Sequence, residues 1–585
     1  MCDRRRQMIK RLLGCVREYK VYAILTPIFI ILEVLLETMI PTVMGMIIDQ
    51  GIMVGNMNRI LQLGGILAIM ALFSLACGMG NGYTGAIAST GFAKNLRHDM
   101  YYAIQDYSFT NIDEFSTGSL VTRLTTDVNS IQMAFQMCLR IAFRAPLMLI
   151  TSLILAIRIS SKLSIVFLVA FAILSVVIGF LMKYVMPIFQ RLFKGYDRLN
   201  TTVQENLNGI RVVKSNVRED FEVNKFKDAV QYIYDNNTKA NRYMAMVMPI
   251  MTIVMFGTIL YISYMGGLDV IGLTLSTGEL TTLLTYVNQI LMSFMMVSMV
   301  IVMITQSQAA AKRVAEVLEA KSDIVNKQHP IETISDGSID FEHVSFKYNV
   351  DDESNALSDI DCHIASGETI GIIGTTGCGK TSFVSLIPRL YDASEGCVKV
   401  GGIDVKDYDL NTLRDNVAMV LQQNTLFSGT IRENLQWGDA KASDEQIRHA
   451  CDIACASEFI DKMPNGLDTY IEQGGTNVSG GQKQRLCIAR ALLKHPKILI
   501  LDDSTSACDT HTDATIQHAF ITEIPDVTKI IIAQRISSVQ NCDRIIVLEN
   551  GKINAIGNHE QLLASNGIYQ QVYQSQTKGE SNESK

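Results

Sequence analysis

The sequence has few charged residues, and they are distributed unevenly. Charged side chains make up 19% of the 585 residues, against 48% hydrophobic ones. The first 310 residues hold long apolar runs, while the remainder has the composition of an ordinary soluble domain. The length is enough for about three or four domains. We therefore expect an N-terminal membrane half and a C-terminal soluble half.

Three further absences narrow the function classes. The net charge of −7, without a basic patch among aromatics, argues against nucleic-acid binding. The 12 cysteines form no disulfide framework, and Cys451 and Cys455 have no second pair at zinc-site spacing. No cleaved targeting segment is indicated, because the apolar run after the basic N-terminus is far longer than that of a signal peptide.

Six long apolar segments follow the N-terminus, each near the roughly 20 residues that span a bilayer as a helix. Residues 1–20 mix apolar side chains with lysine and arginine, which is typical of a helix lying on the inner membrane surface. The expected cores of the six spans are 21–48, 60–83, 143–157, 163–186, 246–268 and 280–304.

The connections between the spans alternate in length and charge. Residues 183–242 carry eleven lysines and arginines, whereas the short connections 49–59, 158–162 and 269–279 carry three together. Positive charge is retained on the cytoplasmic side, so we expect the long connections and both termini in the cytosol. The long connections are helical in composition, which predicts helices that extend past the membrane and turn round.

Two turns in the long connections are candidates for contact with the soluble half. One is residues 111–118, with Asn111 or Asp113 as the expected helix cap. The other is residues 214–223, which follow Gly209. Short helices that press on a soluble domain and ordinary loops explain these residues equally well.

Two carboxylates interrupt the first apolar segment. Glu33 and Glu37 are four residues apart and so lie on one helix face. Charge at membrane depth is costly, so they should face a cavity or pair with a cation such as Arg140 or Arg144. A structural ion pair between helices and contact with a transported molecule both remain open.

The soluble half is organised around Gly374–Thr381, which reads Gly-Thr-Thr-Gly-Cys-Gly-Lys-Thr. This is a complete phosphate-binding loop between a strand-like and a helix-like run. The glycines turn backbone N–H groups toward an anion, Lys380 reaches the β- and γ-phosphates, and Thr381 ligates Mg²⁺. The apolar run 497–501 ends in Asp502, a carboxylate suited to nucleotide-bound Mg²⁺. These residues predict a nucleotide site.

The whole set of motifs resembles the ATP-binding cassette (ABC) exporters over nearly the full length. Ser479-Gly480-Gly481-Gln482 looks like the family signature, and Gln422 looks like the Q-loop glutamine. Tyr348 looks like the aromatic that stacks on adenine, and residues 506–509 look like the loop that crosses the dimer interface. The resemblance implies an α-helical transmembrane domain of six long helices, of the type IV exporter kind, followed by an α/β P-loop nucleotide-binding domain.

The resemblance also implies the domain limits and the site residues. The domains are an elbow helix at 1–20, a membrane domain at 21–320, a linker at 321–336, a nucleotide-binding domain at 337–575 and a polar tail at 576–585. The residues expected to bind ATP are Tyr348, Gly374, Thr375, Thr376, Gly377, Cys378, Gly379, Lys380, Thr381, Ser382, Gln422, Ser479, Gly480, Gly481, Gln482 and Asp509. Those expected to ligate Mg²⁺ are Thr381, Gln422 and Asp502. Cys378 is expected to be open to thiol reagents.

Two departures from the family fall on the same chemical step. The residue after the Mg²⁺-binding Asp502 is usually Glu, which acts on the attacking water, but here it is Asp503. The switch motif usually holds His, but here it holds Gln534, which donates a hydrogen bond and cannot shuttle a proton. A carboxylate about 1.5 Å short is a serious defect, since misplacement by about 1 Å can cost about a hundredfold in rate.

The departures predict a half-transporter whose own site binds ATP but hydrolyses it weakly. Its intact signature would complete a competent site on a second, related chain that carries the usual Glu and His. The expected setting is the bacterial cytoplasmic membrane, and the expected cargo is a drug or lipid of amphipathic character. The alternatives are a membrane-bound ATP sensor or regulatory subunit, and a homodimeric flippase of lipids or drugs that tolerates Asp503.

Overall fold

The computed structural model describes residues 2–349, 352, 354–504 and 506–583. Within them, the description omits the side chains of 2–7, 178, 181, 182, 190, 193, 298, 302, 305, 306 and 577–583. The chain divides into two compact units. The first is Met1–Gln105 with Thr117–Ala320, and the second is Asp106–Ser116 with Lys321–Lys585.

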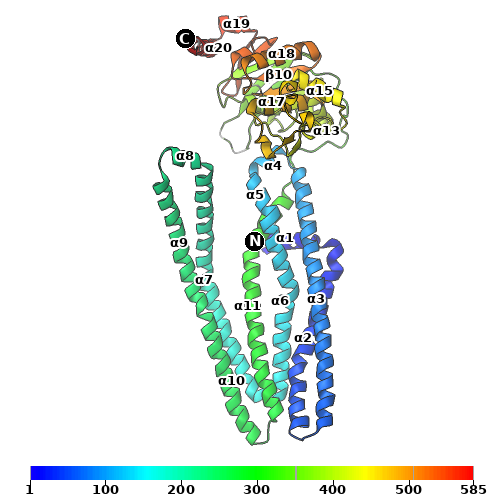
Figure 1. The fold of residues 1–585 in the computed structure, drawn as a ribbon, viewed down its shortest axis with the longest axis vertical. Helices are drawn as coiled ribbons and strands as arrows, with labels where there is room; N and C mark the ends of the chain where they lie inside the picture. Colours follow the sequence, from blue (N-terminus) through cyan, green and yellow to red (C-terminus); the bar gives the residue numbers. More distant parts are fainter. Residues whose placement is uncertain (1, 350–351, 353, 505, 584–585) are drawn as a thin grey trace. The chain divides into compact units, whose positions relative to one another are not determined.

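The first unit is entirely helical in the part of it that the structure describes (Figure 1). Its long helices are α2 (Lys20–Ile47), α3 (Met57–Gln105), α6 (Val128–Ile159), α7 (Ser161–Asn208), α9 (Glu219–Ala245), α10 (Val247–Ile271) and α11 (Thr277–Glu319). Its short elements are α1 (Cys2–Gly14), η1 (Arg17–Tyr19), η2 (Ile48–Ile52), α5 (Thr117–Thr122), η3 (Arg123–Asp127) and α8 (Ile210–Ser215). As predicted, helices continue well past the apolar segments into both long connections.

Each of the six expected spans falls on a helix of this unit. Among the described residues, five stretches are long and apolar enough to cross a membrane: 17–52, 57–105, 117–159, 219–271 and 277–301. The fourth expected span lies on α7, whose described apolar stretch, Ser161–Val177, is shorter. Six helices in this order agree with the predicted transmembrane domain.

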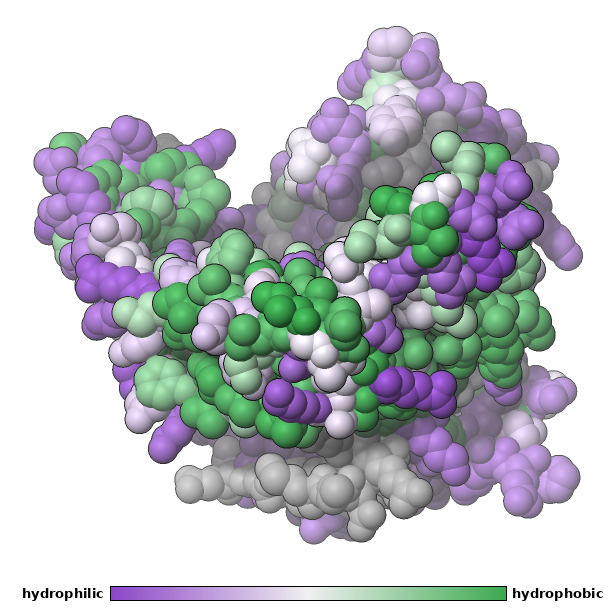
Figure 2. All heavy atoms as spheres, turned by 90° about the horizontal axis from the view of Figure 1, so that it is seen from below, coloured by the Kyte–Doolittle hydropathy of each residue, from purple (hydrophilic) through white to green (hydrophobic). Residues whose placement is uncertain are grey.

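Hydrophobic side chains cover the outside of these helices. Figure 2 shows many of them, in green, on the face seen from below. Leu72, Phe73, Val176, Ile253 and Leu260 are all more than half exposed. In a soluble protein so much exposed apolar surface would promote association, whereas lipid covers it in a membrane.

Helices α2 and α11 approach each other closely at two glycines. A Cβ on Gly278 would lie 2.1 Å from the carbonyl oxygen of Gly45, so a larger side chain would force the helices apart. Next to this contact, Asp49 accepts hydrogen bonds from the Ser276 hydroxyl (2.5 Å) and the Gly278 N–H (2.8 Å). Ser276 also caps α11 in a capping box with Glu279. These contacts join the first and last long helices at one end.

The carboxylates of the first span are paired. Arg144 donates to Glu33 (2.6 Å) and to Glu37 (2.5 Å), which ties α6 to α2. Arg140 reaches the same group through Asn81, which accepts from Arg140 (3.0 Å) and donates to Glu33 (2.8 Å). The geometry confirms the predicted cationic partner as Arg144 and favours a structural ion pair between helices.

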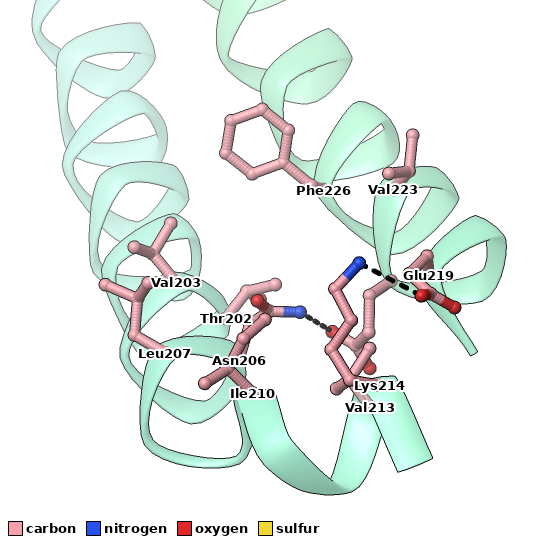
Figure 3. Close-up of a pocket in the computed structure, with 11 residues that line it drawn as sticks. Thr202, Val203, Asn206, Leu207, Ile210, Val213, Lys214, Glu219, Val223 and Phe226 are labelled. Carbon is pink, nitrogen blue, oxygen red and sulfur yellow. Dashed lines mark hydrogen bonds and ion pairs between the residues drawn. The ribbon is translucent and has the colours of Figure 1, made fainter. Parts of the chain in front are cut away.

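The second expected turn forms a short helix at the tip of a long hairpin, slightly earlier than predicted. Helix α8 runs over Ile210–Ser215 after Gly209, and α9 begins at Glu219. A mostly apolar hollow of about 350 Å³ lies inside this tip, and Figure 3 shows residues that line it. Lys214 pairs with Glu219 (3.0 Å), and Asn206 donates to Glu222 (3.2 Å), so polar contacts hold its rim.

The first expected turn is also a short helix, but its predicted cap was wrong. Helix α4 runs over Phe109–Glu114 and packs with the second unit. Its N-cap is Ser108, whose hydroxyl accepts from the Asn111 N–H, while the Asn111 side chain accepts from the Ser108 N–H. Asn111 therefore stands at the third helical position of a capping box, where its side chain still satisfies the helix end.

The second unit is an α/β domain with two main sheets. One is antiparallel, with the order β2-β1-β4-β5, and the other has the order β12-β11-β3-β10-β9-β6. Their strands are β1 (Ile339–Phe346), β2 (Leu357–Ile364), β3 (Thr369–Gly374), β4 (Glu395–Val400), β5 (Ile403–Asp404), β6 (Val417–Val420), β9 (Ile498–Asp502), β10 (Thr528–Ile532), β11 (Arg544–Glu549) and β12 (Lys552–Gly557). A third, small sheet pairs β7 (Gly429–Thr430) with β8 (Tyr470–Ile471).

Helices and single turns cover these sheets. The helices are α12 (Lys380–Ser385), α13 (Leu410–Asn416), α14 (Ile431–Leu435), α15 (Asp444–Ile453), α16 (Ser457–Ile460), α17 (Gly480–Leu492), α18 (Thr510–Glu523), α19 (His559–Ser565) and α20 (Gly567–Glu583). The turns are η4 (Val405–Asp407), η5 (Gly466–Asp468), η6 (Gln473–Gly475) and η7 (Ile536–Ser538). Strands β9 and β10 are buried at every position, as expected of a parallel sheet covered on both faces.

The C-terminal segment, predicted only to be polar, is helical in its described part. Residues 576–585 were expected to be a polar tail, but α20 continues to Glu583, and 584–585 lie outside the described residues. Tyr569 on this helix is fully buried, and Ile568, Val572 and Tyr573 pack against the core of the domain. The apolar residues before the tail therefore anchor the helix.

Candidate nucleotide site

Four neighbouring parallel strands end at one edge of the large sheet and bring the predicted motifs together. In spatial order they are β3, β10, β9 and β6. The phosphate-binding loop follows β3, Gln534 follows β10, Asp502 ends β9 with Asp503 directly after it, and Gln422 follows β6. Ligands of open α/β sheets bind outside these carboxyl ends. The spatial order of the strands differs from their order in the sequence, and it is the spatial order that brings these residues together in one site.

The phosphate-binding loop has the backbone that an anion requires. Gly379, at the start of α12, has φ of +98°, and a Cβ there would meet the Ala356 carbonyl oxygen at 2.7 Å. Only glycine fits this position without strain. The Lys380 ammonium donates to the carbonyl oxygens of Gly374 and Thr375 (2.9 Å each). The ammonium thus lies across the mouth of the loop, where an incoming phosphate would compete for it.

The donors expected to hold Mg²⁺ are adjacent. The Thr381 hydroxyl donates to the Asp502 carboxylate (2.8 Å), which is 2% exposed. Burial raises the pKa of Asp502, and the hydrogen bond from Thr381 opposes that shift. Among the described residues no three His, Cys, Asp or Glu side chains form a metal site of their own. A hydroxyl and one carboxylate beside a phosphate cradle suit Mg²⁺, which keeps phosphate oxygens and waters as ligands.

The two residues that depart from the family pattern contact each other. The Gln534 side chain donates to the Asp503 carboxylate (2.9 Å), and Gln422 lines the same pocket. Burial raises the pKa of Asp503, and the hydrogen bond from Gln534 opposes the shift. Asp503 also has a left-handed backbone, with φ of +51°, a conformation that Asp tolerates better than most side chains. The Asp503 carboxylate is therefore bound by a side-chain amide, which cannot carry a proton away from it.

An aromatic side chain closes the pocket on the other side. The Tyr348 hydroxyl shares a hydrogen bond with the Ser382 hydroxyl (2.8 Å) at the start of α12. Tyr391 contacts the Tyr348 ring edge-on (5.2 Å between centroids) and donates to the Asp113 carboxylate on α4 (2.6 Å). Burial raises the pKa of the Tyr391 hydroxyl, and the bond to Asp113 acts in the same direction. Helix α4 is thus linked to the predicted adenine-stacking residue through Tyr391.

The signature residues lie elsewhere in the domain. Ser479 caps α17 in a capping box with Gln482, so the signature residues form the N-terminus of this helix. Gln484 on this helix accepts from the Ala507 N–H (3.0 Å), which holds the loop 506–509 against it. Asp509 caps α18 and accepts from the Thr512 N–H (2.8 Å), and that bond lowers its pKa.

The pocket collects most of the predicted site residues but not all of them. It measures about 320 Å³, and the predicted residues that line it are Tyr348, Thr376, Gly377, Gly379, Lys380, Thr381, Ser382, Gln422, Asp502, Asp503 and Gln534. Gly374, Thr375 and Cys378 form the loop without lining the pocket. Ser479, Gly480, Gly481, Gln482 and Asp509 do not line it either.

One prediction about the loop is wrong, and two lining residues were missed. Cys378 is 3% exposed, with its sulfur beneath the loop, so it is not open to reagents as expected. The turn of the loop brings this sulfur close to Gly374, where an added Cβ would lie 2.6 Å from it. Ala356 and Ile532 line the pocket unpredicted. Ile532 ends β10, two residues before Gln534, and could have been inferred, whereas Ala356 lies directly before β2 and has no sequence signal.

Comparison with known proteins agrees with this geometry. Residues 23–294 match the family described as ABC transporter transmembrane region, and residues 357–506 match the family described as ABC transporter. The chain is 34% identical to "Uncharacterized ABC transporter ATP-binding protein YfiB" of Bacillus subtilis (strain 168) over 579 residues, 98% of this chain and 100% of that protein. It is 38% identical to "ATP-dependent lipid A-core flippase" of Desulfotalea psychrophila over 379 residues, 65% of this chain and 66% of the flippase.

Proposed function

Because the chain belongs to the ABC transporters, we propose that it is one half of a heterodimeric exporter in a bacterial cytoplasmic membrane. The exporter uses ATP to move amphipathic small molecules, drugs or lipids, out of the cell, and both termini of the chain are cytoplasmic. The lipid A-core flippase relative supports a lipid-like cargo. The bacterial sources of the similar proteins support the location.

The observation that carries the proposal is the contact between Asp503 and Gln534. The carboxylate that should act on the attacking water is one methylene short, and its neighbour is an amide. An amide orients a partner by hydrogen bonding but takes up no proton at neutral pH. In this proposal the pocket therefore binds MgATP firmly and turns it over slowly.

The other residues of the pocket are complete for binding. Lys380 and the loop amides hold the phosphates, Tyr348 supports the adenine ring, and Thr381 with Asp502 orients the metal. Mg²⁺ held by Thr381 and Asp502 would supply positive charge that offsets the negative charge developing on the phosphates. Asp502 is buried and ionises more readily beside a cation, so metal binding offsets the cost of its burial.

The placement of the signature supports the need for a second chain. Its residues open α17 and are absent from the pocket that the phosphate-binding loop lines. In the proposed dimer the signature of one chain covers the nucleotide bound by the other. This chain's intact signature then completes the hydrolytic site of a partner that carries the usual Glu and His.

The test is a comparison of the chain alone with the chain co-expressed with a candidate partner, a related ABC half-transporter that carries the usual Glu and His. We expect the purified chain to bind MgATP with little turnover, and the pair to hydrolyse ATP and transport fluorescent lipids or drugs. The double change Asp503→Glu and Gln534→His should raise ATP hydrolysis in the pair at least tenfold at the site built on this chain's own phosphate-binding loop. Robust turnover and transport by the chain alone would refute the heterodimer.

The same experiment separates the remaining alternatives. A homodimeric flippase, favoured by the similarity to the lipid A-core flippase, would transport without a partner. An ATP-binding sensor or regulatory subunit, favoured by the Asp503–Gln534 contact, would bind ATP but support no transport in any pairing.

A further inference from the structure

Helix α20 carries a polar residue on the face that packs against the domain. Tyr569, Val572, Tyr573 and Gln576 recur at the spacing i, i+3, i+4 and i+7, which places them on one side of the helix. The Tyr569 hydroxyl is hydrogen-bonded to His559 (2.7 Å), and its ring is fully buried. Core packing thus fixes the helix, and Gln576 is the next residue on the packed face.

Gln576 makes two hydrogen bonds to the backbone of the switch motif, the residues around Gln534. Its amide nitrogen donates to the Gln534 carbonyl oxygen (2.7 Å), and its amide oxygen accepts from the Ile536 N–H (2.9 Å). We call this pair of bonds the Gln576 bridge. One side-chain amide therefore satisfies a backbone acceptor and a backbone donor two residues apart.

The bridge acts at the point where the switch motif leaves the sheet. Strand β10 ends at Ile532, η7 begins at Ile536, and Gln534 lies between them. On the far side, the Gln534 side chain donates to Asp503 in the nucleotide pocket. The backbone of Gln534 is thus held by α20 while its side chain points into the site.

We propose that Gln576 is a positioning residue for the nucleotide site: it holds the backbone of residues 534–536 so that the Gln534 amide is directed at the γ-phosphate. This role rests on the proposed function, since it assumes that ATP occupies the pocket. It extends the machinery of the site to the last helix of the chain, which does not line the pocket.

The chemistry of the bridge makes the proposal testable by substitution. Leucine at 576 has a similar size but neither donor nor acceptor. Glutamate keeps an acceptor for the Ile536 N–H and lacks a donor for the Gln534 carbonyl, so it retains one bond of the two. Gln570 on the same helix is a matched control, because its amide donates to the Leu563 carbonyl (2.6 Å), away from the switch motif.

The first measurement is hydrogen–deuterium exchange of the full-length protein without nucleotide. In Gln576→Leu we expect exchange in residues 533–540 to rise about three- to tenfold, because a lost hydrogen bond shifts local opening by about that factor. Gln576→Glu should give a smaller rise, and Gln570→Leu none in this segment. Equal exchange in Gln576→Leu and the wild type would overturn the proposal.

The second measurement compares MgATP with MgADP, which lacks the γ-phosphate. We expect Gln576→Leu to bind MgATP about three- to tenfold more weakly, with MgADP affinity unchanged. An equal loss for both nucleotides, or no loss for either, would overturn the positioning role, since a merely structural residue affects them alike. If the wild type binds neither nucleotide, the proposed function fails, and exchange in residues 533–540 alone decides whether the bridge holds the switch motif.

Discussion

The ion pairs within the membrane unit allow a quantitative prediction. Arg144→Met would leave Glu33 and Glu37 without the guanidinium that both contact, at 2.6 and 2.5 Å. Methionine retains most of the volume, so the main loss is charge. Two carboxylates would then share one helix face inside the apolar stretch 17–52. Uncompensated charge at that depth should destabilise the helical unit.

The size of the effect follows from burial. Removing one partner of a buried ion pair costs about 3–5 kcal/mol. The side chains of Arg144, Glu33 and Glu37 are 25%, 13% and 34% exposed, so we expect a value near the lower end. A loss of about 3 kcal/mol corresponds to about 6 °C in Tm, taking about 2 °C per kcal/mol for a large unit.

The assay is thermal unfolding in lipid nanodiscs, followed with a dye that fluoresces on reaction with newly exposed thiols. Cys77, buried on α3, would report on this unit. The triple change Arg144→Met, Glu33→Gln and Glu37→Gln should recover most of the lost Tm, because an all-neutral group is often as stable as the ion pair. Arg158→Met, an exposed arginine on the same helix, is the control.

A contrary result would reverse the interpretation of this group. If Arg144→Met kept its Tm while transport by the proposed heterodimer fell sharply, Arg144, Glu33 and Glu37 would serve the cargo and not the packing of α2 against α6. An unrecovered triple variant would show that shape, and not charge balance, was lost.

Two further predictions concern the nucleotide-binding domain. Tyr391→Phe keeps the ring but removes its hydrogen bond to Asp113, so exchange in residues 106–116 should rise a few-fold while ATP affinity stays within about twofold; unchanged exchange would show that the bond does not hold α4. Burial raises the pKa of Asp502, so its ionised form destabilises the nucleotide-free fold at neutral pH, a cost that disappears as the pH falls through that raised pKa. Asp502→Asn should therefore raise the Tm of the nucleotide-free protein at pH 7 but not at acid pH, and should abolish the stabilisation by MgATP; a lower Tm at pH 7 would contradict this argument.

Local patterns determined the helices and the phosphate-binding loop. The apolar segments predicted six helices because a bilayer demands about 20 apolar residues of each span. Gly374–Thr381 predicted a phosphate cradle because glycine spacing is a local backbone property. The cap of α4 was misjudged because Ser108 and Asn111 both suit a helix start, and only the backbone shows which of them occupies it.

Residues that act across the fold had weaker signals. Asp503 and Gln534 were predicted to serve one step, but their 2.9 Å contact depends on β9 and β10 being neighbours. Gln576 lies in a stretch that was expected to be a polar tail. Nothing in its local sequence indicates that it contacts the switch motif. Tyr391 likewise has no motif of its own, and it matters because Tyr348 and Asp113 lie on either side of it.

The amino-acid sequence by itself determined what this protein is made of: membrane-spanning helices, a phosphate-binding loop and an aspartate at position 503, directly after the buried strand residue Asp502. These depend on neighbours along the chain, which composition and spacing record. Only the tertiary structure decided that Arg144 neutralises both Glu33 and Glu37, that Cys378 is buried, and that the last helix holds the switch motif. Such contacts join residues distant in sequence, and strand order and helix packing alone bring them together.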